Sequence, residues 1–346
     1  MSSHAMNIKA SDRAALLGII GRFRQQRVVL LGDLVADEFI QGEIVRISRE
    51  APVLILKQLE KRIVPGGGAN AANNLVELGA RLTLAGAVGD DESGESLLRY
   101  FREKRVSTRR VATLRGHMTP TKSRVLGVLA HGHPQQIVRL DREPGGKLDR
   151  RVRRRLTKSV LPVLAEASAL LVADYGYGAT DSAEMEFLRR RARRPGRERS
   201  LPITLDSRYD LPSYFGLTAA TPNEPEIEEA TGKRIGNDID LLHRVGRKVL
   251  RRQSFEALLI TRGREGMVLF QTRRAPQHLP IFGSGQVADV TGAGDTVIAA
   301  FTLALAAGAS FLQAAMLANC AGGLVVMKSG TATVTGGELA EAIRNA

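Results

Sequence analysis

The residues best suited to chemistry lie in the segment D-V-T-G-A-G-D-T at 289–296. A small-residue turn, Gly-Ala-Gly at 292–294, stands directly before the carboxylate of Asp295, and an uncharged segment of helical length, 297–309, follows. Small residues let the backbone approach a ligand closely, and the free N–H groups at a helix N-terminus favour an anion. The segment therefore predicts an anion at the start of a helix with an acid/base group beside it, as phosphoryl transfer requires. The alternative is an aspartate that only stabilises the helix dipole.

A second small-residue turn, P-G-G-G-A-N-A-A-N-N-L-V-E-L-G-A at 65–80, also precedes a helical pattern. Its glycines permit close backbone approach to a ligand. The amide of Asn70 can both donate hydrogen bonds to vicinal hydroxyls and accept them. By itself such a run of glycines is only a turn, but its position before a helix predicts a binding site.

The elements that position these turns follow an alternating strand and helix pattern. V-V-L-L-G-D at 28–33 is typical of a buried parallel strand, and further strands are expected at 170–174, 202–206 and 257–261. This order predicts one mostly parallel sheet with helices on both faces, in a single domain spanning 1–346. Because ligands bind beyond the carboxyl ends of such strands, Asp33 is expected to bind a ligand hydroxyl, with a loop-capping role as the alternative.

Two further segments, 37–60 and 111–141, alternate apolar and polar residues, and A-H-G-H-P at 130–134 predicts a hairpin turn. Alternation places Lys122 and Arg124 on the same face of one strand. Cations there, with Arg139, would suit a phosphate on a substrate. Ordinary exposed charges are the alternative for each of them, and Arg46 and Arg49 are further candidates.

Composition limits the possible partners. The 346 residues carry a net charge of +14, much of it in two Arg-rich runs at 149–158 and 189–199, but aromatic residues make up only 4% and Trp is absent. Stacking platforms for single strands are therefore poorly supplied. We expect no nucleic-acid partner, and the positive charge suits anionic small molecules.

The single cysteine and the apolar segments indicate in which cellular compartment the protein is expected. A single cysteine, Cys320, excludes an intrachain disulfide and favours a reducing compartment. The uncharged segment 296–327 is interrupted by Gly308 and Ser310, which predicts two buried helices and no membrane span. No signal peptide is visible, so a cytoplasmic protein is expected. Residues 1–5, M-S-S-H-A, read as the remnant of an expression tag.

The motifs together resemble those of the ribokinase-like (PfkB) carbohydrate kinases, from about residue 28 to about residue 338. The turns at 65–80 and 289–296 match the two signatures of that family, and T-P-N-E-P-E at 221–226 contains its N-x-x-E motif. The resemblance implies a three-layer α/β/α fold with a small β-sheet lid over the sugar. It also implies ATP and Mg²⁺, with a monovalent cation such as K⁺ as a further candidate.

The resemblance, with the reasoning above, assigns roles to individual residues. Asp295 is expected to be the general base, and the backbone N–H groups before it are expected to hold the phosphoryl oxygens. Glu226 is expected to organise Mg²⁺ through water, and its neighbour Glu224 stays open as an alternative. The catalytic candidates are Asp295, Gly292, Ala293 and Gly294. The substrate-binding candidates are Asp33, Gly66, Gly67, Gly68, Asn70, Lys122, Arg124, Arg139 and Asp174. The nucleotide-binding candidates are Asn223, Arg208, Thr261, Gly263, Gly266 and Asn319.

Three segments, 46–53, 121–125 and 328–335, further resemble the branch that phosphorylates D-glycero-D-manno-heptose 7-phosphate at its anomeric hydroxyl, in lipopolysaccharide precursor synthesis. Another sugar or sugar phosphate is the alternative acceptor, because Tyr177 stands where that branch usually has Lys. A sugar- or nucleotide-binding protein without turnover is a third reading, which the intact turn before Asp295 disfavours. The resemblance also implies a homodimer through the lid. Because the chain ends at Ala346, a separate nucleotidyltransferase is expected to act downstream.

Overall fold

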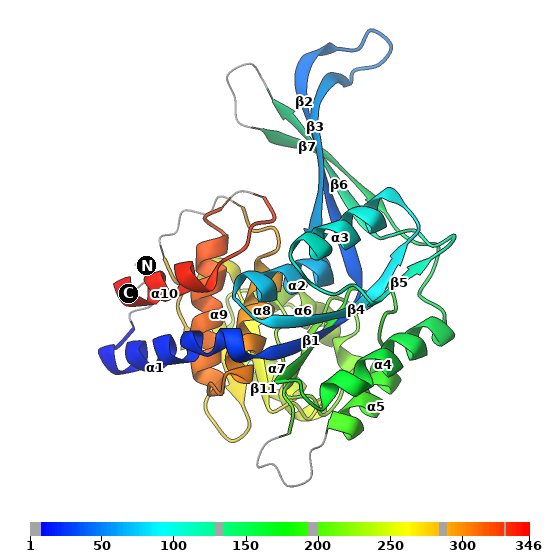
Figure 1. Cartoon of the computed structure of the whole chain (residues 1–346). Coiled ribbons are helices and arrows are strands. Elements are labelled where there is room, and N and C mark those ends of the chain that lie inside the picture. The colour runs from blue at the N-terminus through cyan, green and yellow to red at the C-terminus, as the bar shows by residue number, and fades with distance from the viewer. Residues whose placement is uncertain (1–7, 129–133, 193–199, 284–288, 329) are drawn as a thin grey trace.

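Two β-sheets of different size organise the computed structural model, which describes residues 8–128, 134–192, 200–283, 289–328 and 330–346. The larger sheet forms the centre of the body, and the smaller one projects from it (Figure 1). Three features of the sequence lie wholly or partly outside the described residues. These are the tag-like segment 1–5, most of the hairpin turn at 130–134 and the end of the Arg-rich run at 189–199.

Among the described residues the central sheet has nine strands in the order β13-β12-β11-β10-β9-β8-β1-β4-β5. The pairs from β5 to β11 are parallel, and only β12 and β13 run antiparallel to their neighbours. The strands are β1 (Arg27–Gly32), β4 (Arg81–Gly89), β5 (Arg110–Leu114), β8 (Ala169–Asp174), β9 (Ile203–Ser207), β10 (Ala219–Ala220), β11 (Ala257–Thr261), β12 (Met267–Gln271) and β13 (Gln277–Leu279).

Apolar residues fill both faces of this sheet, which explains the nearly continuous hydrophobic strands in the sequence. On β1, Leu30 belongs to one core while Val29 and Leu31 belong to the other. The first core packs under α1 (Ala10–Gly21), α2 (Gly67–Glu77), α3 (Glu92–Glu103), α8 (Ala293–Ala306), α9 (Phe311–Val325) and α10 (Gly336–Asn345). The second packs under α4 (Arg150–Leu164), α5 (Ser182–Ala192), α6 (Glu224–Thr231) and α7 (Ile239–Arg252). The expected three-layer α/β/α arrangement is confirmed.

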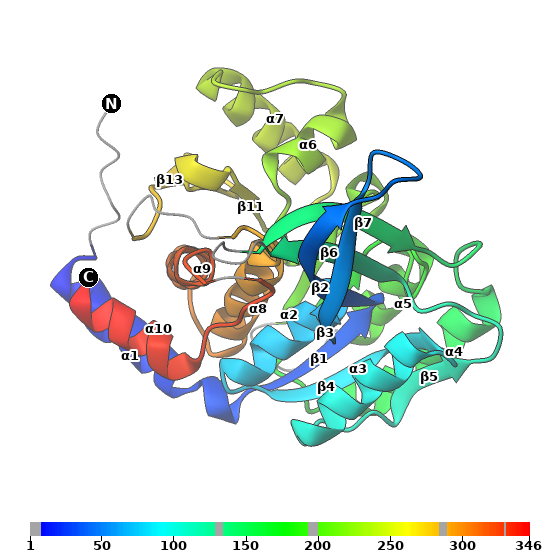
Figure 2. The same cartoon turned by 90° about the horizontal axis from the view of Figure 1, so that it is seen from above.

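The uncharged C-terminal segment forms two buried helices, α8 and α9, as the break at Gly308 and Ser310 predicts. Cys320 on α9 is buried and free. In the part of the chain that the structure describes, no helix has the length and hydropathy needed to span a bilayer. Helices α1 and α10, from opposite ends of the chain, lie side by side (Figure 2).

The smaller sheet, here called the lid, has four strands in the order β3-β2-β6-β7 within the described residues. They are β2 (Leu34–Ile47), β3 (Leu54–Gly66), β6 (Thr121–Val128) and β7 (Gln135–Arg142). Strand β6 runs parallel to β2 and antiparallel to β7, which confirms the hairpin strands predicted on either side of residues 130–134. One assignment was wrong: residues 111–114, counted with the lid, belong to β5 and pair with β4 at the edge of the central sheet.

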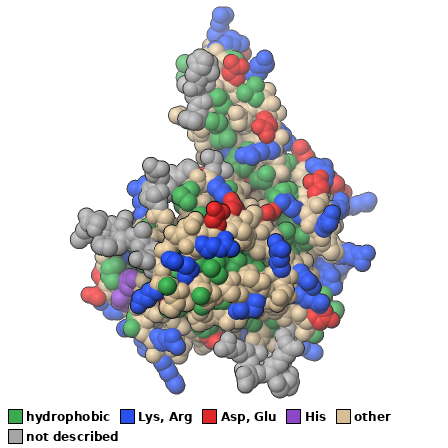
Figure 3. All heavy atoms as spheres, turned by 60° about the vertical axis from the view of Figure 1, so that its left-hand side comes forward, with side chains coloured by type: hydrophobic (Ala, Val, Ile, Leu, Met, Phe, Trp, Pro, Cys, Tyr) green, Lys and Arg blue, Asp and Glu red, His purple; other side chains and the backbone are tan. Residues whose placement is uncertain are grey.

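The Arg-rich run at 149–158 lies at the start of α4, where Asp149 caps the helix. Lys and Arg side chains are spread as separate groups over the face shown in Figure 3, among hydrophobic and acidic side chains. Some of these positive charges are neutralised by ion pairs, such as that of Arg153 with Asp181. The Arg-rich start of α4 is therefore a largely exposed helix face.

Candidate active site

A cavity of about 430 Å³ lies between the lid and the carboxyl ends of the central strands. This is the position where open α/β sheets bind ligands. The lid contributes Asp37, Lys122, Arg124 and Arg139 to its wall. The body contributes Gly67, Tyr175, Asp206, Arg208, Thr221, Asn223, Glu226, Thr261, Val290, Thr291, Gly292, Gly294 and Asp295.

The turn before Asp295 has the conformation that its small residues permit. Helix α8 begins at Ala293, and its N-cap Gly292 has φ 77°, in the left-handed region that favours glycine. A Cβ at position 292 would lie 2.5 Å from the side-chain nitrogen of Asn70. Asp295 lies in the first turn of the helix and lines the cavity together with Gly292 and Gly294. The predicted anion site at a helix N-terminus therefore opens into this cavity.

The carboxylate of Asp295 is buried and held from two sides. The Asn70 side-chain amide donates to its Oδ2 at 2.8 Å, and the Tyr175 hydroxyl donates to its Oδ1 at 2.5 Å. Burial raises the pKa of Asp295 to about 8, the negative charge of Asp206 adds to the rise, and the two hydrogen bonds oppose it. A carboxyl group tuned close to neutral pH, facing a cavity, suits a general base better than a residue that only stabilises a helix dipole.

Tyr175 is a site residue that the sequence reading missed. Its side chain lines the cavity, and its hydroxyl lies within hydrogen-bonding distance of two carboxylates, Asp295 at 2.5 Å and Asp206 at 3.2 Å. Burial and the neighbouring carboxylates raise the pKa of Tyr175 well above its ordinary value, so the hydroxyl stays protonated and remains a donor. The sequence singles out only the neighbouring Tyr177, and nothing local to residues 174–178 indicates that Tyr175 would reach α8.

Asn70 and two of the three glycines differ from their predicted role. Asn70 is fully buried behind Asp295 and does not line the cavity, so its side-chain amide contacts the carboxylate and not the cavity. A Cβ on Gly68 would lie 2.4 Å from the backbone oxygen of Asp33, and one on Gly66 would lie 2.7 Å from the carboxyl carbon of Asp37. These two glycines let α2 start close to the sheets, and Gly67 alone of the three lines the cavity.

Asp33 and Asp174 anchor loops and do not line the cavity. The Asp33 carboxylate accepts the backbone N–H groups of Tyr175, Tyr177 and Ala179 at 2.8–2.9 Å. Asp174 accepts the hydroxyl of Tyr214 at 2.8 Å and that of Ser207 at 3.0 Å. Neither carboxylate therefore faces the cavity in the way that the strand ends predict: the loop after β8 folds back onto Asp33, and the hydroxyls of Ser207 and Tyr214 contact Asp174.

The lid carboxylate that does face the cavity is Asp37, which the sequence reading did not single out. It accepts from Arg124 at 2.7 Å and from the Thr331 hydroxyl at 3.1 Å. The chain passes almost directly from β1 into β2, so the carboxylate that reaches the cavity lies on the lid strand, beyond the end of β1. Asp37 also pairs with Lys122 across the sheet, which places the two side chains on the same face.

The three predicted lid cations all line the cavity. Arg124 is committed to Asp37, and Arg139 forms two hydrogen bonds of 2.9 Å with Asp141. Lys122 has no ion pair in the described structure, and its Nζ lies 5.9 Å from the centre of the Tyr175 ring. Burial and the nearby Arg208 lower the pKa of Lys122. An anion near Lys122 would stabilise its charged form and so oppose this lowering of the pKa.

Asn223 and Glu226 form the rim of the cavity at the start of α6. The Asn223 side chain accepts from the backbone N–H of Glu226 at 2.8 Å, and Glu226 accepts from the backbone N–H of Asn223 at 2.9 Å. This capping box explains the N-x-x-E spacing. Glu224 instead pairs with Arg262 at 2.6 Å and does not line the cavity, so the choice left open between the two glutamates falls on Glu226.

The remaining nucleotide-side candidates divide into two groups. Thr261 and Arg208 line the cavity, and Arg208 Nη1 lies 3.7 Å from Glu226 Oε1. Gly263, Gly266 and Asn319 are not part of the cavity wall. Gly266 has φ 76° and packs against the backbone of β13, and Asn319 donates to the Pro280 carbonyl at 2.7 Å. The structure thus explains Gly266 and Asn319 by local packing.

Three carboxylates of the cavity, Asp206, Glu226 and Asp295, lie near one another on the body side, where a divalent cation would balance part of their charge. Burial raises the pKa of both Asp206 and Glu226, and each negative charge opposes the ionisation of its neighbours. Among the described residues no three His, Cys, Asp or Glu side chains are arranged to hold a metal by themselves. Mg²⁺ keeps several waters and shares phosphate oxygens, so Glu226 and Asp206 fit an ion that arrives with a nucleotide.

The comparison with protein families agrees with this geometry. A family model described as pfkB family carbohydrate kinase matches residues 26–335. The chain belongs to the pfkB family. It is therefore an ATP-dependent carbohydrate kinase.

Individual relatives add detail. The chain is 38% identical over 333 residues to the bifunctional protein HldE of Pelobacter propionicus, which covers 96% of this chain and 66% of the relative. It is 40% identical over 329 residues to the HldE protein of Coxiella burnetii strain Dugway, covering 94% of this chain and 65% of the relative. The chain thus spans somewhat less than two thirds of the length of these relatives.

Solved structures confirm the ribokinase-like fold. Arabidopsis thaliana ribokinase complexed with ribose and ATP superposes with a TM-score of 0.70 at 18% identity, covering 92% of this chain and 98% of that one. Escherichia coli phosphofructokinase-2 in complex with fructose-6-phosphate gives a TM-score of 0.70 at 17% identity, with the same coverage.

Tyr175→Phe is expected to move the acid limb of the kcat/KM profile to higher pH. The hydroxyl of Tyr175 lowers the pKa of Asp295, so its removal leaves the base protonated over a wider range. Activity should fall most at neutral pH and recover as pH rises. Tyr177→Phe is the matched control, because the Tyr177 hydroxyl donates to Glu143 and the residue does not line the cavity. An unchanged pH profile in Tyr175→Phe would remove Tyr175 as the group that tunes Asp295.

Asp295→Asn is expected to stabilise the fold increasingly as pH rises from 5 to 8. Burial raises the pKa of Asp295 from its ordinary 3.8 to about 8, so in this window the folded protein keeps a proton that the unfolded chain releases. Stability of the wild type therefore falls with rising pH, whereas the amide carries no charge. Calorimetry at several pH values checks the difference in Tm. A difference that does not grow with pH would contradict the buried, proton-holding state.

Proposed function

We propose that this chain transfers the γ-phosphoryl group of ATP to the anomeric hydroxyl of D-glycero-D-manno-heptose 7-phosphate, in the synthesis of the ADP-heptose precursor of lipopolysaccharide core. The observation that carries the proposal is that one cavity holds both a candidate base and candidate phosphate-binding cations. Asp295 lines it at the start of α8, and Lys122 and Arg139 line it on the lid opposite. An acceptor that already bears a phosphate needs a base at its reacting end and cations at its far end. The similarity to HldE proteins over nearly the whole chain supports the same assignment.

The reaction follows from where these groups lie. Asp295 takes the proton of the acceptor hydroxyl as its oxygen forms a bond to the γ-phosphorus, and the bond from that phosphorus to the bridging oxygen of ADP breaks. Backbone N–H groups at the start of α8 face the charge that develops on the phosphoryl oxygens. Mg²⁺, when bound, would neutralise the charge of the phosphates. Asn70 and Tyr175 hold Asp295 in place.

The lid would keep water away from the reacting atoms. Its four strands cover the cavity with Asp37, Lys122, Arg124 and Arg139 on the inner face. Asp37, held by Arg124 and Thr331, is placed to accept hydrogen bonds from sugar hydroxyls. Excluding water matters because water competes with the sugar hydroxyl as the nucleophile.

The alternative, a kinase for another sugar or sugar phosphate, rests on Tyr177. The Tyr177 hydroxyl donates to Glu143 at 2.9 Å, and the residue is absent from the described cavity wall. Its replacement of the usual Lys therefore changes a position outside this wall, so the substitution by itself does not favour the alternative.

The direct test is ADP release from MgATP with a panel of acceptors: D-glycero-D-manno-heptose 7-phosphate, fructose 6-phosphate, fructose 1-phosphate, ribose and adenosine. Turnover confined to the heptose phosphate is the expected result. Faster turnover on another member would replace the acceptor and keep the mechanism. Running the panel in KCl and in NaCl tests our proposal that a monovalent cation activates the enzyme, which is motivated by a phosphofructokinase-2 structure in complex with potassium.

We also propose that two copies pair through their lids and that a nucleotidyltransferase consumes the product. Val138 and Leu140 of β7 are exposed on the face opposite to Arg139, as alternation along the strand requires. Exposed apolar residues on a projecting sheet are typical of an interface. Leu140→Lys is expected to shift the protein towards monomer in sedimentation equilibrium. A wild-type monomer, or an unaffected dimer, would contradict pairing by this face.

A further inference from the structure

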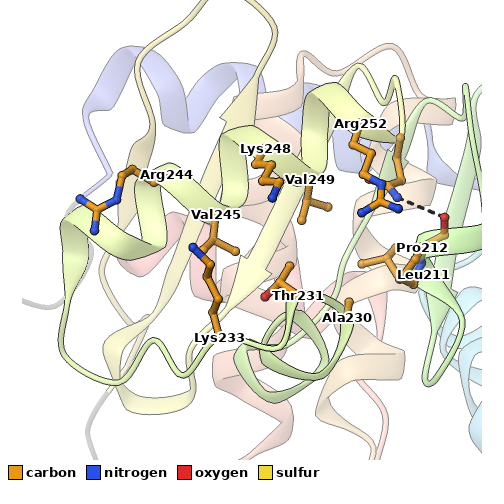
Figure 4. Close-up of a pocket in the computed structure, with 11 residues that line it drawn as sticks. Leu211, Pro212, Ala230, Thr231, Lys233, Arg244, Val245, Lys248, Val249 and Arg252 are labelled. Carbon is orange, nitrogen blue, oxygen red and sulfur yellow. Dashed lines mark hydrogen bonds between the residues drawn. The ribbon is translucent and has the colours of Figure 1, made fainter.

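A second cavity, of about 160 Å³, lies between the end of α6, one face of α7 and the short helix η2 (Leu211–Ser213) (Figure 4). It shares no lining residue with the active-site cavity. Helix α6 presents Glu226 near its start to the active site and Ala230 and Thr231 at its end to this second cavity. The two cavities therefore lie at opposite ends of a helix about 12 Å long.

One wall of the second cavity is apolar. Val245 and Val249 contribute from α7, Leu211 and Pro212 from η2, and Ala230 from α6. The two valines and Leu211 are otherwise buried in the second core. Such a wall suits the C–H face of a small ring.

The rim of the cavity is cationic. Lys233 reaches towards it from the loop after α6, and Lys248 and Arg252 reach towards it from α7 (Figure 4). The structure shows no ion pair for these three side chains within its described residues, whereas Arg244, further out, lies 4.0 Å from Asp238. No acidic residue lines the described cavity. The rim therefore favours an anion, and Arg and Lys are the side chains that bind phosphate.

A buried acceptor without a partner belongs to the same cavity. Gln253 is 3% exposed and lines the wall, and its Nε2 donates to the Pro212 carbonyl at 3.2 Å. That bond fixes which end of the amide is the nitrogen. The opposite end, Oε1, has no hydrogen-bond partner. Buried polar atoms are normally satisfied, and Oε1 is covered as the side chain stands, so a small movement of the Gln253 amide towards the cavity would let Oε1 accept a hydrogen bond from a ligand hydroxyl.

We propose that this cavity binds a small phosphate ester that carries free hydroxyl groups, of the size of a monosaccharide phosphate. Its ring would pack on the valines, a hydroxyl would donate to Gln253, and the phosphate would lie among Lys233, Lys248 and Arg252. The volume decides the size class, because a cavity of roughly 150 Å³ holds one six-membered ring. A nucleotide, with a base as well as a sugar, is too large for it. The site is independent of which acceptor the kinase uses.

The test is methyl NMR of the full-length protein with labelled valine, titrated separately with glucose 6-phosphate, ribose 5-phosphate, glucose and inorganic phosphate. Val245 and Val249 report this cavity, and Val290 reports binding in the active site. We expect at least one sugar phosphate to shift the Val245 and Val249 methyl signals with a Kd about tenfold or more below those of glucose and inorganic phosphate.

Variants of α7 make the result specific. Lys248→Gln with Arg252→Gln should weaken this binding about tenfold or more. Arg247→Gln with Arg251→Gln removes the same charge from the same helix at exposed positions outside the cavity, and should leave the binding unchanged. The proposal is overturned if neither sugar phosphate shifts these signals, if inorganic phosphate binds as tightly, or if both double variants lose binding equally.

Discussion

Asp295→Asn is expected to lower kcat by about 10²- to 10⁴-fold, the usual contribution of a general base. The amide keeps the size of the side chain and can still bond to Asn70 and Tyr175, so the cavity should retain its shape. What is lost is the acceptor of the hydroxyl proton. Steady-state ADP release gives kcat, and calorimetric titration with the nucleotide shows whether MgATP still binds.

The alternative role of Asp295, stabilising the dipole of α8, has its own control. Asp240 is an exposed acidic residue in the first turn of α7, so Asp240→Asn removes a comparable helix-terminal charge. We expect that variant to keep its activity. Two results would exclude Asp295 as the base: substantial turnover in Asp295→Asn, or an equal loss in both variants. The rise in Tm expected for Asp295→Asn at pH 8 also separates a folded, inactive enzyme from an unfolded one.

Lys122→Ala is expected to raise the KM of a phosphorylated acceptor by about 10- to 100-fold, the range for hydrogen bonds to a charged group. Lys122 faces the cavity, is partly buried and has no ion pair in the described structure, so its charge is available to the substrate. The KM of an unphosphorylated acceptor should change much less. Comparing the two acceptors by steady-state kinetics isolates the phosphate contact, and equal effects on both would defeat it.

The choice among the lid cations depends on what else they touch. Arg124→Ala would leave Asp37 without its partner, so its effect would mix substrate binding with the loss of a buried ion pair. Arg139 is already paired with Asp141 at an exposed position, where a smaller effect is expected. Lys57 is an exposed lysine on β3 that does not line the cavity, so Lys57→Ala is the matched control for Lys122→Ala.

The local sequence was sufficient to predict a structural feature wherever all the residues that form the feature lie in one short segment. The turn at 292–294 has a glycine where the backbone is left-handed and starts α8 where the pattern predicts. The spacing of Asn223 and Glu226 is that of a capping box, which needs no other part of the chain. Alternation along β6 was enough to place Lys122 and Arg124 on one face.

Prediction failed where a side chain serves a segment distant in sequence. Asp33 ends a strand, as many ligand-binding carboxylates do, but the loop at 175–179 folds back and donates three N–H groups to it. Asn70 was assigned to the substrate because an amide can bind hydroxyls, yet α8 brings Asp295 against it. In both cases the competing partner lies more than a hundred positions away.

By itself, the sequence determined the alternation of strands and helices, the small-residue turn before Asp295, the N-x-x-E spacing at Glu226 and the shared face of Lys122 and Arg124. These features depend on backbone conformation and on periodicities of two and 3.6 residues, which are local properties of a chain. Only the tertiary structure decided that Asp37 and not Asp33 faces the cavity, that Tyr175 and Asn70 hold Asp295, and that α6, α7 and η2 enclose a second, cationic cavity. Hydrogen bonding and burial decide those choices, because a polar group is taken by whichever partner the fold brings within reach.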